Sequence, residues 1–303
     1  MALRFSIITP TLNRHDMLVE ALDSVGRQCW PEIEHIIVDG GSTDGTLELV
    51  AERPELHLIR GPDSGVYEAL NKGIAAATGD VIGLLNSDDI LEQKAIMAAA
   101  LAFTSNPTCD SVCGSARLVA DGETIEIYDC LEDKRLVSAH TALLGASTIN
   151  ARFFRKSALE TIGRFSTAFS IVSDRDFLMR AITLGLRTTP IDALVYTYRR
   201  HRGSLSFSGE AARRPAVWLE LLALARYWSQ ANEASAKTKR VARGLEGRCL
   251  GRLMQRELLS GGPGNAWRII SQNGPGLLRN LGAMGHGLIA ATTDRIAVST
   301  GLR

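Results

Sequence analysis

Two adjacent carboxylates, Asp88 and Asp89, follow the apolar residues 81–85 and are preceded by Asn86 and Ser87. A short apolar run bounded by polar residues predicts a buried strand. Carboxylates at the carboxyl end of such a strand lie where open α/β sheets bind ligands. Their oxygens suit Mg²⁺ or Mn²⁺, which proteins hold with one or two carboxylates and the phosphates of a substrate. The sequence therefore predicts metal-assisted binding of a substrate that carries a diphosphate.

Acids at two other places could also do chemistry. Asp39 ends an apolar run and precedes two glycines, which let the backbone approach a ligand closely. A carboxylate there can accept a hydrogen bond from an N–H group of a base. Asp174 and Asp176 open a predicted helix, where acids are also favoured by the helix dipole. Because residues two apart on a helix point in different directions, we do not expect both acids to act on one atom.

Alternating strands and helices must position these groups. Strands are expected at residues 5–9, 35–38, 56–59 and 81–85, and helices at residues 17–27, 46–51, 66–77 and 94–103. Short apolar strands between helices are typical of a mostly parallel sheet with helices on both faces. Further along, we expect a hairpin around Asp121-Gly122, loops and short helices over 138–172, a helix at 174–184 and a strand at 193–198.

Charge divides the chain near residue 210. Residues 1–210 contain 20 Lys+Arg and 28 Asp+Glu, a balance of −8. The remaining residues up to 303 contain 14 and 5, a balance of +9, and their pattern is helical. We therefore expect an α/β domain at 1–210 and a basic helical C-terminal region at 211–303.

Composition points to the cytoplasm. No run of about 18 apolar residues predicts a membrane-spanning helix. The first residues contain no basic segment followed by a long apolar one, so a cleaved secretory signal is not expected. The five cysteines are scattered and do not complete a zinc site, which favours free thiols in a reducing compartment.

Four segments together resemble the family 2 inverting glycosyltransferases, which have the GT-A fold. They are residues 7–13, 38–46, 64–89 and 173–180. They occur in the family's order and spacing, and the resemblance covers about residues 4–205. It implies a GT-A-type nucleotide-sugar-binding domain, whereas the chain beyond residue 210 resembles no family known to us.

The resemblance also implies roles for individual residues. In the family, the residue at Asp39 meets the uracil ring, and the acid at Asp174 is the general base. A divalent metal, Mn²⁺ or Mg²⁺, is expected on Asp88 with His201 as a second ligand, and imidazole suits Mn²⁺ better. The nucleotide-sugar-binding residues implied are Thr9, Pro10, Thr11, Asn13, Asp39, Ser42, Asp63, Lys72, Asn86, Ser87, Asp88 and Arg199.

The acidic motif departs from the family pattern. Asn86 stands where the family's Asp-x-Asp motif has its first acid. Because Asn supplies no charge, we expect the metal to rest on Asp88. Asp89 is either a second metal ligand or the cap of the next helix, and we favour the cap.

Several assignments have a structural alternative. The segment from Ser42 to Asp44 could be a helix cap, since both residue types satisfy free N–H groups. Lys72 could be a solvated charge. The basic residues of 150–156 could meet an acidic acceptor or form a solvated face. Asp176 is expected to orient its neighbours or to pair with Arg180.

The function hypothesis is an inverting glycosyltransferase with a nucleotide diphosphate-sugar donor, for which the Asp39 arrangement favours UDP. The acceptor is expected to be a glycan or lipid-linked molecule in polysaccharide or lipid-linked glycan synthesis. Residues 237–259 combine basic and apolar residues, so they form either a basic amphipathic helix lying on the inner face of an anionic membrane or the solvated face of a helix packed on the core. Sparse aromatic residues there argue against nucleic acid.

Two other functions are the alternatives to this one. A non-catalytic nucleotide-sugar-binding or scaffold protein is supported only by Asn86. A nucleotidyltransferase would show a glycine-rich phosphate loop near the first strand, which residues 9–14 do not form. The sequence leaves open the sugar, the nucleotide, the acceptor, the linkage and the oligomeric state.

Overall fold

The computed structural model describes residues 2–130, 138–145, 148–201, 203 and 215–260. The chain divides into two compact units. One is formed by residues 1–142 and 146–208, and the other by residues 143–145 and 209–303.

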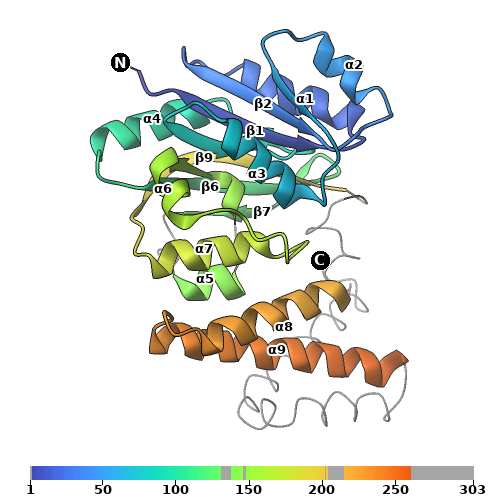
Figure 1. The fold of residues 1–303 in the computed structure, drawn as a ribbon, viewed down its shortest axis with the longest axis vertical. Helices are drawn as coiled ribbons and strands as arrows, with labels where there is room; N and C mark the ends of the chain where they lie inside the picture. Colours follow the sequence, from blue (N-terminus) through green and yellow to red (C-terminus); the bar gives the residue numbers. More distant parts are fainter. Residues whose placement is uncertain (1, 131–137, 146–147, 202, 204–214, 261–303) are drawn as a thin grey trace. The chain divides into compact units, whose positions relative to one another are not determined.

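The first unit is built on one mixed sheet (Figure 1). Its strands are β1 (Phe5–Thr11), β2 (Ile33–Asp39), β3 (His57–Arg60), β4 (Val81–Leu84), β5 (Ile90–Leu91), β6 (Ser111–Ala120), β7 (Glu123–Tyr128), β8 (Arg152–Arg155) and β9 (Thr188–Arg200). In the described part of the chain their order is β3-β2-β1-β4-β8-β6-β9-β5, with β7 paired to β6. The first four strands of this order are parallel, and β8 runs antiparallel to both of its neighbours.

Helices cover both faces of the sheet, as predicted. Besides α5 (Ala139–Leu144), whose residues fall in both units, the helices up to residue 183 are α1 (His15–Gly26), α2 (Thr46–Ala51), α3 (Val66–Ala76), α4 (Ala95–Ser105), α6 (Lys156–Ile162) and α7 (Ser173–Thr183). Successive side chains of a strand point to opposite faces. Phe5 and Ile7 join the core beneath α1 and α4. Ile8 points the other way, where a Cβ at Gly73 would come within 2.3 Å of it, so glycine lets α3 approach β1.

The predicted hairpin is confirmed by the register of β6 and β7. Asp121 and Gly122 have φ angles of 51° and 84°, which are typical of a type I′ turn. The strand β8 was not predicted, because only Phe153 and Phe154 are apolar in it.

The basic residues around β8 hold the fold together. Arg152 is 1% exposed. Arg155 donates to the carbonyls of Cys109 and Phe103, and Lys156 donates to the Ala77 carbonyl at 2.8 Å. Neither sequence interpretation of residues 150–156, an acceptor-binding segment or a solvated face, describes these side chains.

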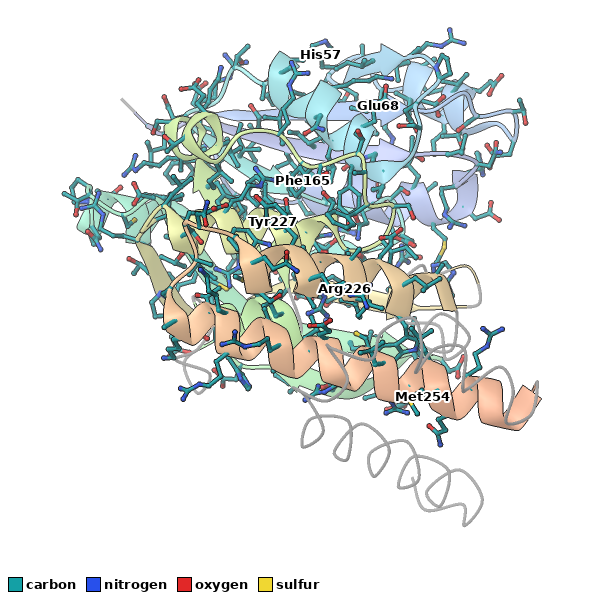
Figure 2. All side chains as sticks on the ribbon, turned by 60° about the horizontal axis from the view of Figure 1, so that its bottom comes forward. His57, Glu68, Phe165, Arg226, Tyr227 and Met254 are labelled. Carbon is teal, nitrogen blue, oxygen red and sulfur yellow. The ribbon has the colours of Figure 1, made fainter. Side chains whose placement is uncertain are left out.

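The second unit contains the predicted helices, α8 (Pro215–Gln230) and α9 (Ala236–Ser260), which pack on each other. Figure 2 labels Arg226 and Tyr227 on α8 and Met254 on α9. The apolar residues Leu245 and Leu250 of α9 are buried, so they are used for packing, and contact of the basic residues with a membrane stays a prediction. Among the described helices, none is long and apolar enough to cross a bilayer.

Candidate active site

The carboxyl ends of β1 and β2 meet at one edge of the sheet. Thr11, the last residue of β1, is paired with Asp39, the last residue of β2. The chain leaves β4 beside them, where the Leu85 amide donates to the Ile8 carbonyl. Many of the predicted site residues therefore emerge along this edge.

The Asp39 carboxylate is 1% exposed, and its two oxygens have different surroundings. Oδ1 accepts hydrogen bonds from the amides of Gly41 and Ser42, each at 2.9 Å. Oδ2 is buried and has no hydrogen-bond partner within the described residues. Buried acceptors are nearly always satisfied in folded proteins, so this oxygen is suited to a donor from a ligand.

Thr11 adds a second such atom next to it. Its Oγ1 is buried and, like Asp39 Oδ2, lacks a partner in the part of the chain that the structure describes. The side chain of Thr9, by contrast, is engaged inside the unit, where Oγ1 lies 2.9 Å from His35 Nε2. Burial lowers the pKa of His35 to about 3, so this ring is neutral. Pro10 is buried in the same strand, and its contact with a nucleoside stays a prediction.

Asn13 and Ser42 fix the loop that follows Asp39. The Asn13 amide donates to Ser42 Oγ at 2.8 Å, and the Thr43 amide donates to Asn13 Oδ1 at 2.8 Å. Asp44 acts as a cap, because its carboxylate accepts the amides of His15 and Thr46 at the starts of α1 and α2. These residues position the Asp39 loop, while direct contact of Asn13 or Ser42 with a nucleotide stays a prediction.

Asp63 reaches the same loop from the turn before α3. Its Oδ1 accepts the Gly65 amide at 3.0 Å, and a Cβ on Gly40 would lie 2.8 Å from its Oδ2. Lys72 is pinned nearby, donating to the Pro62 carbonyl at 2.7 Å and lying 3.3 Å from Glu68. The ammonium therefore supports the turn that carries Asp63 while staying partly exposed, and its contact with a nucleotide stays a prediction.

Asp88 and His201 come together although 113 residues separate them. Asp88 Oδ2 lies 2.9 Å from His201 Nε2, and both side chains are partly exposed. The Gly203 amide donates to His201 Nδ1 at 3.1 Å, which places the ring proton on Nε2, facing Asp88.

Asp89 is buried, and its hydrogen bonds hold the loop that also carries Asp88. Its carboxylate accepts the Tyr196 hydroxyl at 2.8 Å, the Asn86 side-chain amide at 2.9 Å and the Arg199 backbone amide at 2.8 Å. Burial, and then the charge of Asp88, raise the pKa of Asp89 to about 7. The expectation that Asp89 caps the next helix is wrong, because α4 begins six residues later at Ala95 without a side-chain cap.

Arg199 also helps to hold this loop in place. Its guanidinium donates to the carbonyls of Asp88 and Met17 and forms an ion pair with Glu20 at 2.9 Å. These bonds tie the acidic loop to α1. The geometry thus gives Arg199 a positioning role, and the prediction that it binds the nucleotide-sugar directly has no support from these contacts.

Asp174 is the second residue of α7. Its Oδ1 accepts the Arg175 amide at 2.8 Å and lies 3.3 Å from the Tyr67 hydroxyl. Burial raises the pKa of Tyr198 well above its usual value, and the charges of Asp89 and Asp174 add to this. Asp176 pairs with Arg180 at 2.9 Å, as predicted.

The donor set at Asp88 suits a divalent ion that takes most of its ligands from a substrate. No cluster of three or more His, Cys, Asp or Glu side chains could hold a metal within the described residues. Asp88 and His201 nevertheless converge, and Mg²⁺ commonly uses one or two carboxylates plus phosphates. For His201 to coordinate through Nε2, its proton must move to Nδ1, so Asp88 is the better ligand.

Sequence reasoning missed the support network. Tyr196 is fully buried, and its hydroxyl accepts hydrogen bonds from Asn150 at 2.9 Å and from the Asn86 amide at 3.1 Å. A tyrosine inside a predicted strand was a signal, because a buried phenol needs a polar partner. Tyr67 was part of a recognised motif but received no role.

The family model described as glycosyl transferase family 2 matches residues 6–162. A PGL/p-HBAD biosynthesis glycosyltransferase of Mycobacterium bovis is 32% identical over 212 residues, which are 66% of this chain and 78% of that protein.

Two solved structures are similar in fold. Staphylococcus aureus TarS 1–349 in complex with UDP-GlcNAc aligns with a TM-score of 0.64 and 20% identity, covering 94% of this chain and 82% of that one. The mannosyltransferase PcManGT of Pyrobaculum calidifontis, in complex with GDP-Man and Mn²⁺, aligns with a TM-score of 0.60 and 19% identity, covering 98% and 88%. At these identities the likeness establishes the fold.

Proposed function

Because this chain belongs to glycosyl transferase family 2 and is an enzyme of that family, we propose that it transfers a sugar from a nucleotide diphosphate-sugar to an acceptor hydroxyl with inversion. UDP-sugars are the favoured donors. The enzymatic assignment displaces the scaffold alternative, for which Asn86 was the only argument.

The observation that carries the donor assignment is the pair of buried, unsatisfied oxygens at the ends of β1 and β2. Asp39 Oδ2 can accept the N–H of a pyrimidine ring, and Thr11 Oγ1 can donate to a ring carbonyl. Paired residues of parallel strands project to the same face, so both atoms serve one ligand edge. The contact between Asp63 and Gly40 places a third polar group beside them.

The acidic loop is proposed to meet the diphosphate. Asp88 would hold Mn²⁺ or Mg²⁺, with His201 as its hydrogen-bonded neighbour or second ligand. Such an ion supplies charge neutralisation for a departing diphosphate. Asn86 and Ser87 belong to the same turn. The bond that the Asn86 amide donates to Tyr196 and the bond that Arg199 donates to the Asp88 carbonyl keep that turn in place.

Asp174 is proposed as the general base. The acceptor oxygen attacks the anomeric carbon as the bond from that carbon to the phosphate oxygen breaks. The acceptor's proton goes to Asp174, and the bonding electrons leave with the nucleoside diphosphate. A positioned base of this kind supplies about 10²–10⁴-fold in rate.

The acceptor is proposed to be a glycan or a lipid-linked molecule, with the enzyme at the inner face of the membrane. The similar mycobacterial protein is named a glycosyltransferase of PGL/p-HBAD biosynthesis, which supports an acceptor that belongs to a biosynthetic route. Lys237, Arg240, Arg243 and Arg256 on α9 are exposed and could attract an anionic surface. The buried apolar residues of α9 favour electrostatic contact over insertion.

The test is donor turnover by the full chain. UDP-, GDP- and dTDP-sugars are supplied in turn with Mn²⁺, and release of the nucleoside diphosphate is measured with water as the acceptor. We expect one nucleotide class to turn over, with the released sugar inverted when examined promptly by NMR. Asp174→Asn should lower the rate by about 10²-fold or more. Retained turnover in that variant, or a retained anomeric configuration, would overturn the mechanism.

A further inference from the structure

Tyr67 lies in α3, yet its hydroxyl reaches the segment that carries Asp174. The hydroxyl donates to the Ile171 carbonyl at 2.8 Å and lies 3.3 Å from Asp174 Oδ1. A tyrosine hydroxyl has a single proton, so the two acceptors share it. One phenol thus contacts both the backbone that precedes α7 and the carboxylate at its start.

The ring of Tyr67 is held in place by other aromatic rings. It stacks on Phe165, which Figure 2 labels, with centroids 5.6 Å apart and an interplanar angle of 26°. Phe165 in turn stacks on Phe177 of α7 at 4.4 Å and 21°. Offset stacks of this kind contribute beyond the area they bury. The stack fixes the distance between α3 and α7, and with it the position of the hydroxyl.

Asn71 attaches the same segment to α3 one turn further along. Its side-chain amide donates to the Phe165 carbonyl at 2.9 Å, and its Oδ1 accepts the Phe165 amide at 2.8 Å. The segment from Phe165 to Ile171 is therefore bonded to α3 near both of its ends.

We propose that Tyr67 is a positioning residue for the Asp174 carboxylate and couples the base to the donor side of the site. The inference rests on the proposed function, in which Asp174 is the general base. The coupling follows from the course of α3, which begins directly after the Asp63 turn against Gly40. A single rigid helix thus connects the turn beside Asp39 to the hydroxyl beside Asp174.

The test compares Tyr67→Phe with the wild type in the donor-turnover assay. Phenylalanine keeps the stack on Phe165 and removes only the hydroxyl. We expect kcat to fall about tenfold with the donor KM unchanged, because charge-assisted hydrogen bonds of this type are worth about one order of magnitude. The acidic limb of the kcat–pH profile should move to higher pH, because the carboxylate loses a donor that favours its charged form.

A matched control removes a hydroxyl–carboxylate contact elsewhere. Tyr227 on α8 donates to Glu233 at 3.1 Å, and Tyr227→Phe should change neither kcat nor the profile. The acidic limb is compared only over the pH range in which circular dichroism shows both proteins folded, so it separates positioning from lost protein.

The possible outcomes distinguish this inference from the proposed function. A wild-type chain that turns over no donor would refute the proposed function. A wild-type chain that is active, with Tyr67→Phe equal to it in kcat and in limb position, would overturn the inference alone. A fall in kcat without movement of the acidic limb would show that Tyr67 has only a structural role. That result would also overturn the inference.

Discussion

Two aspartates of one loop, Asp39 and Asp44, show how neighbouring acids can differ between binding a ligand and supporting the fold. Both carboxylate oxygens of Asp44 accept backbone amides, at His15 and Thr46, so each oxygen has a partner within the chain. Asp39 uses one oxygen in the same way and leaves Oδ2 buried without a partner among the described residues. The sequence alone could not show which of the two acids keeps an oxygen without a partner, because this depends on which backbone amides the fold brings near each carboxylate.

Asp88 is the residue on which the metal assignment rests. We predict that Asp88→Asn abolishes the part of nucleotide binding that depends on Mn²⁺ and raises the Kd for UDP at least tenfold, because the charged ligand is lost. Isothermal titration with and without Mn²⁺ measures this. Asp80→Asn, which alters a carboxylate that bonds only the Arg4 amide in the described contacts, is the control. An unchanged metal dependence in Asp88→Asn would move the metal elsewhere.

His35 predicts a pH dependence of stability. Its folded-state pKa of about 3 is below the ordinary value of 6.5, so the unfolded chain binds the proton more readily. Stability from the neutral ring is fully present above about pH 6.5 and is lost as pH falls towards 3. We expect the free energy of unfolding to fall by up to about 1.4 kcal/mol for each pH unit by which the pH is lowered in this window.

The slope is measured by urea unfolding at several pH values for the wild type and for His35→Gln, in which no imidazole titrates. In the variant, the free energy of unfolding should differ much less between pH 6 and pH 4.5 than it does in the wild type. Parallel pH dependence in the two proteins would show that His35 is not buried in its neutral form.

At the scale of elements, local patterns predicted the parallel half of the sheet and its helices. The strands β1, β2 and β4 each contain a short apolar run, and such runs need no knowledge of distant residues. The missed elements are short or carry charge at their ends, as β8 and β5 do. The pairing of β6 with β9, which carries His201 towards Asp88, joins residues about 80 apart and has no local signal.

The resemblance to a family supplied what local patterns could not. It named Asp88, Asp174 and His201 as parts of one site, and the structure brings Asp88 and His201 into contact. It did not reveal that Arg199 and Lys72 are bound to carbonyls of the chain, because hydrogen-bond partners depend on the packed geometry.

The attachment of α3 to the segment before α7 has a measurable energy. Asn71→Ala removes both bonds to the Phe165 backbone, and we expect a loss of about 2 kcal/mol in the free energy of unfolding. Chemical denaturation measures this loss. Asn106→Ala, which removes bonds to the hydroxyls of Thr189 and Thr108, should cost less, about 0.5–1 kcal/mol. Equal losses in the two variants would argue against a special role for the attachment.

At the scale of the whole molecule, the chain joins an acidic catalytic part to a basic helical one. The balances of −8 and +9 nearly cancel, so net charge alone would conceal the asymmetry. The exposed cations of α9 and the burial of its apolar residues define a surface that can bind anions without inserting. Such binding should weaken as salt rises.

We predict that the full chain binds vesicles containing anionic lipid at low salt and leaves them at high salt. Replacing Lys237, Arg240 and Arg243 together by Glu should weaken binding at least tenfold, since each basic residue near such a surface contributes about 1 kcal/mol. Vesicle flotation measures the binding, with neutral vesicles as the control. Flotation of the triple variant at the wild-type level would exclude this surface.

The central claim is that the edge formed by Thr11 and Asp39 binds the base of the donor nucleotide. The most direct measurement is the Kd of UDP for the wild type, Asp39→Asn and the control Asp80→Asn, by isothermal titration with Mn²⁺. Asp39→Asn can keep the bonds to Gly41 and Ser42 while placing an N–H where the ligand's own donor would lie. We predict at least tenfold weaker binding for Asp39→Asn and a change of less than about twofold for Asp80→Asn, whose carboxylate bonds the Arg4 amide. Equal affinity of the wild type and Asp39→Asn would contradict the account.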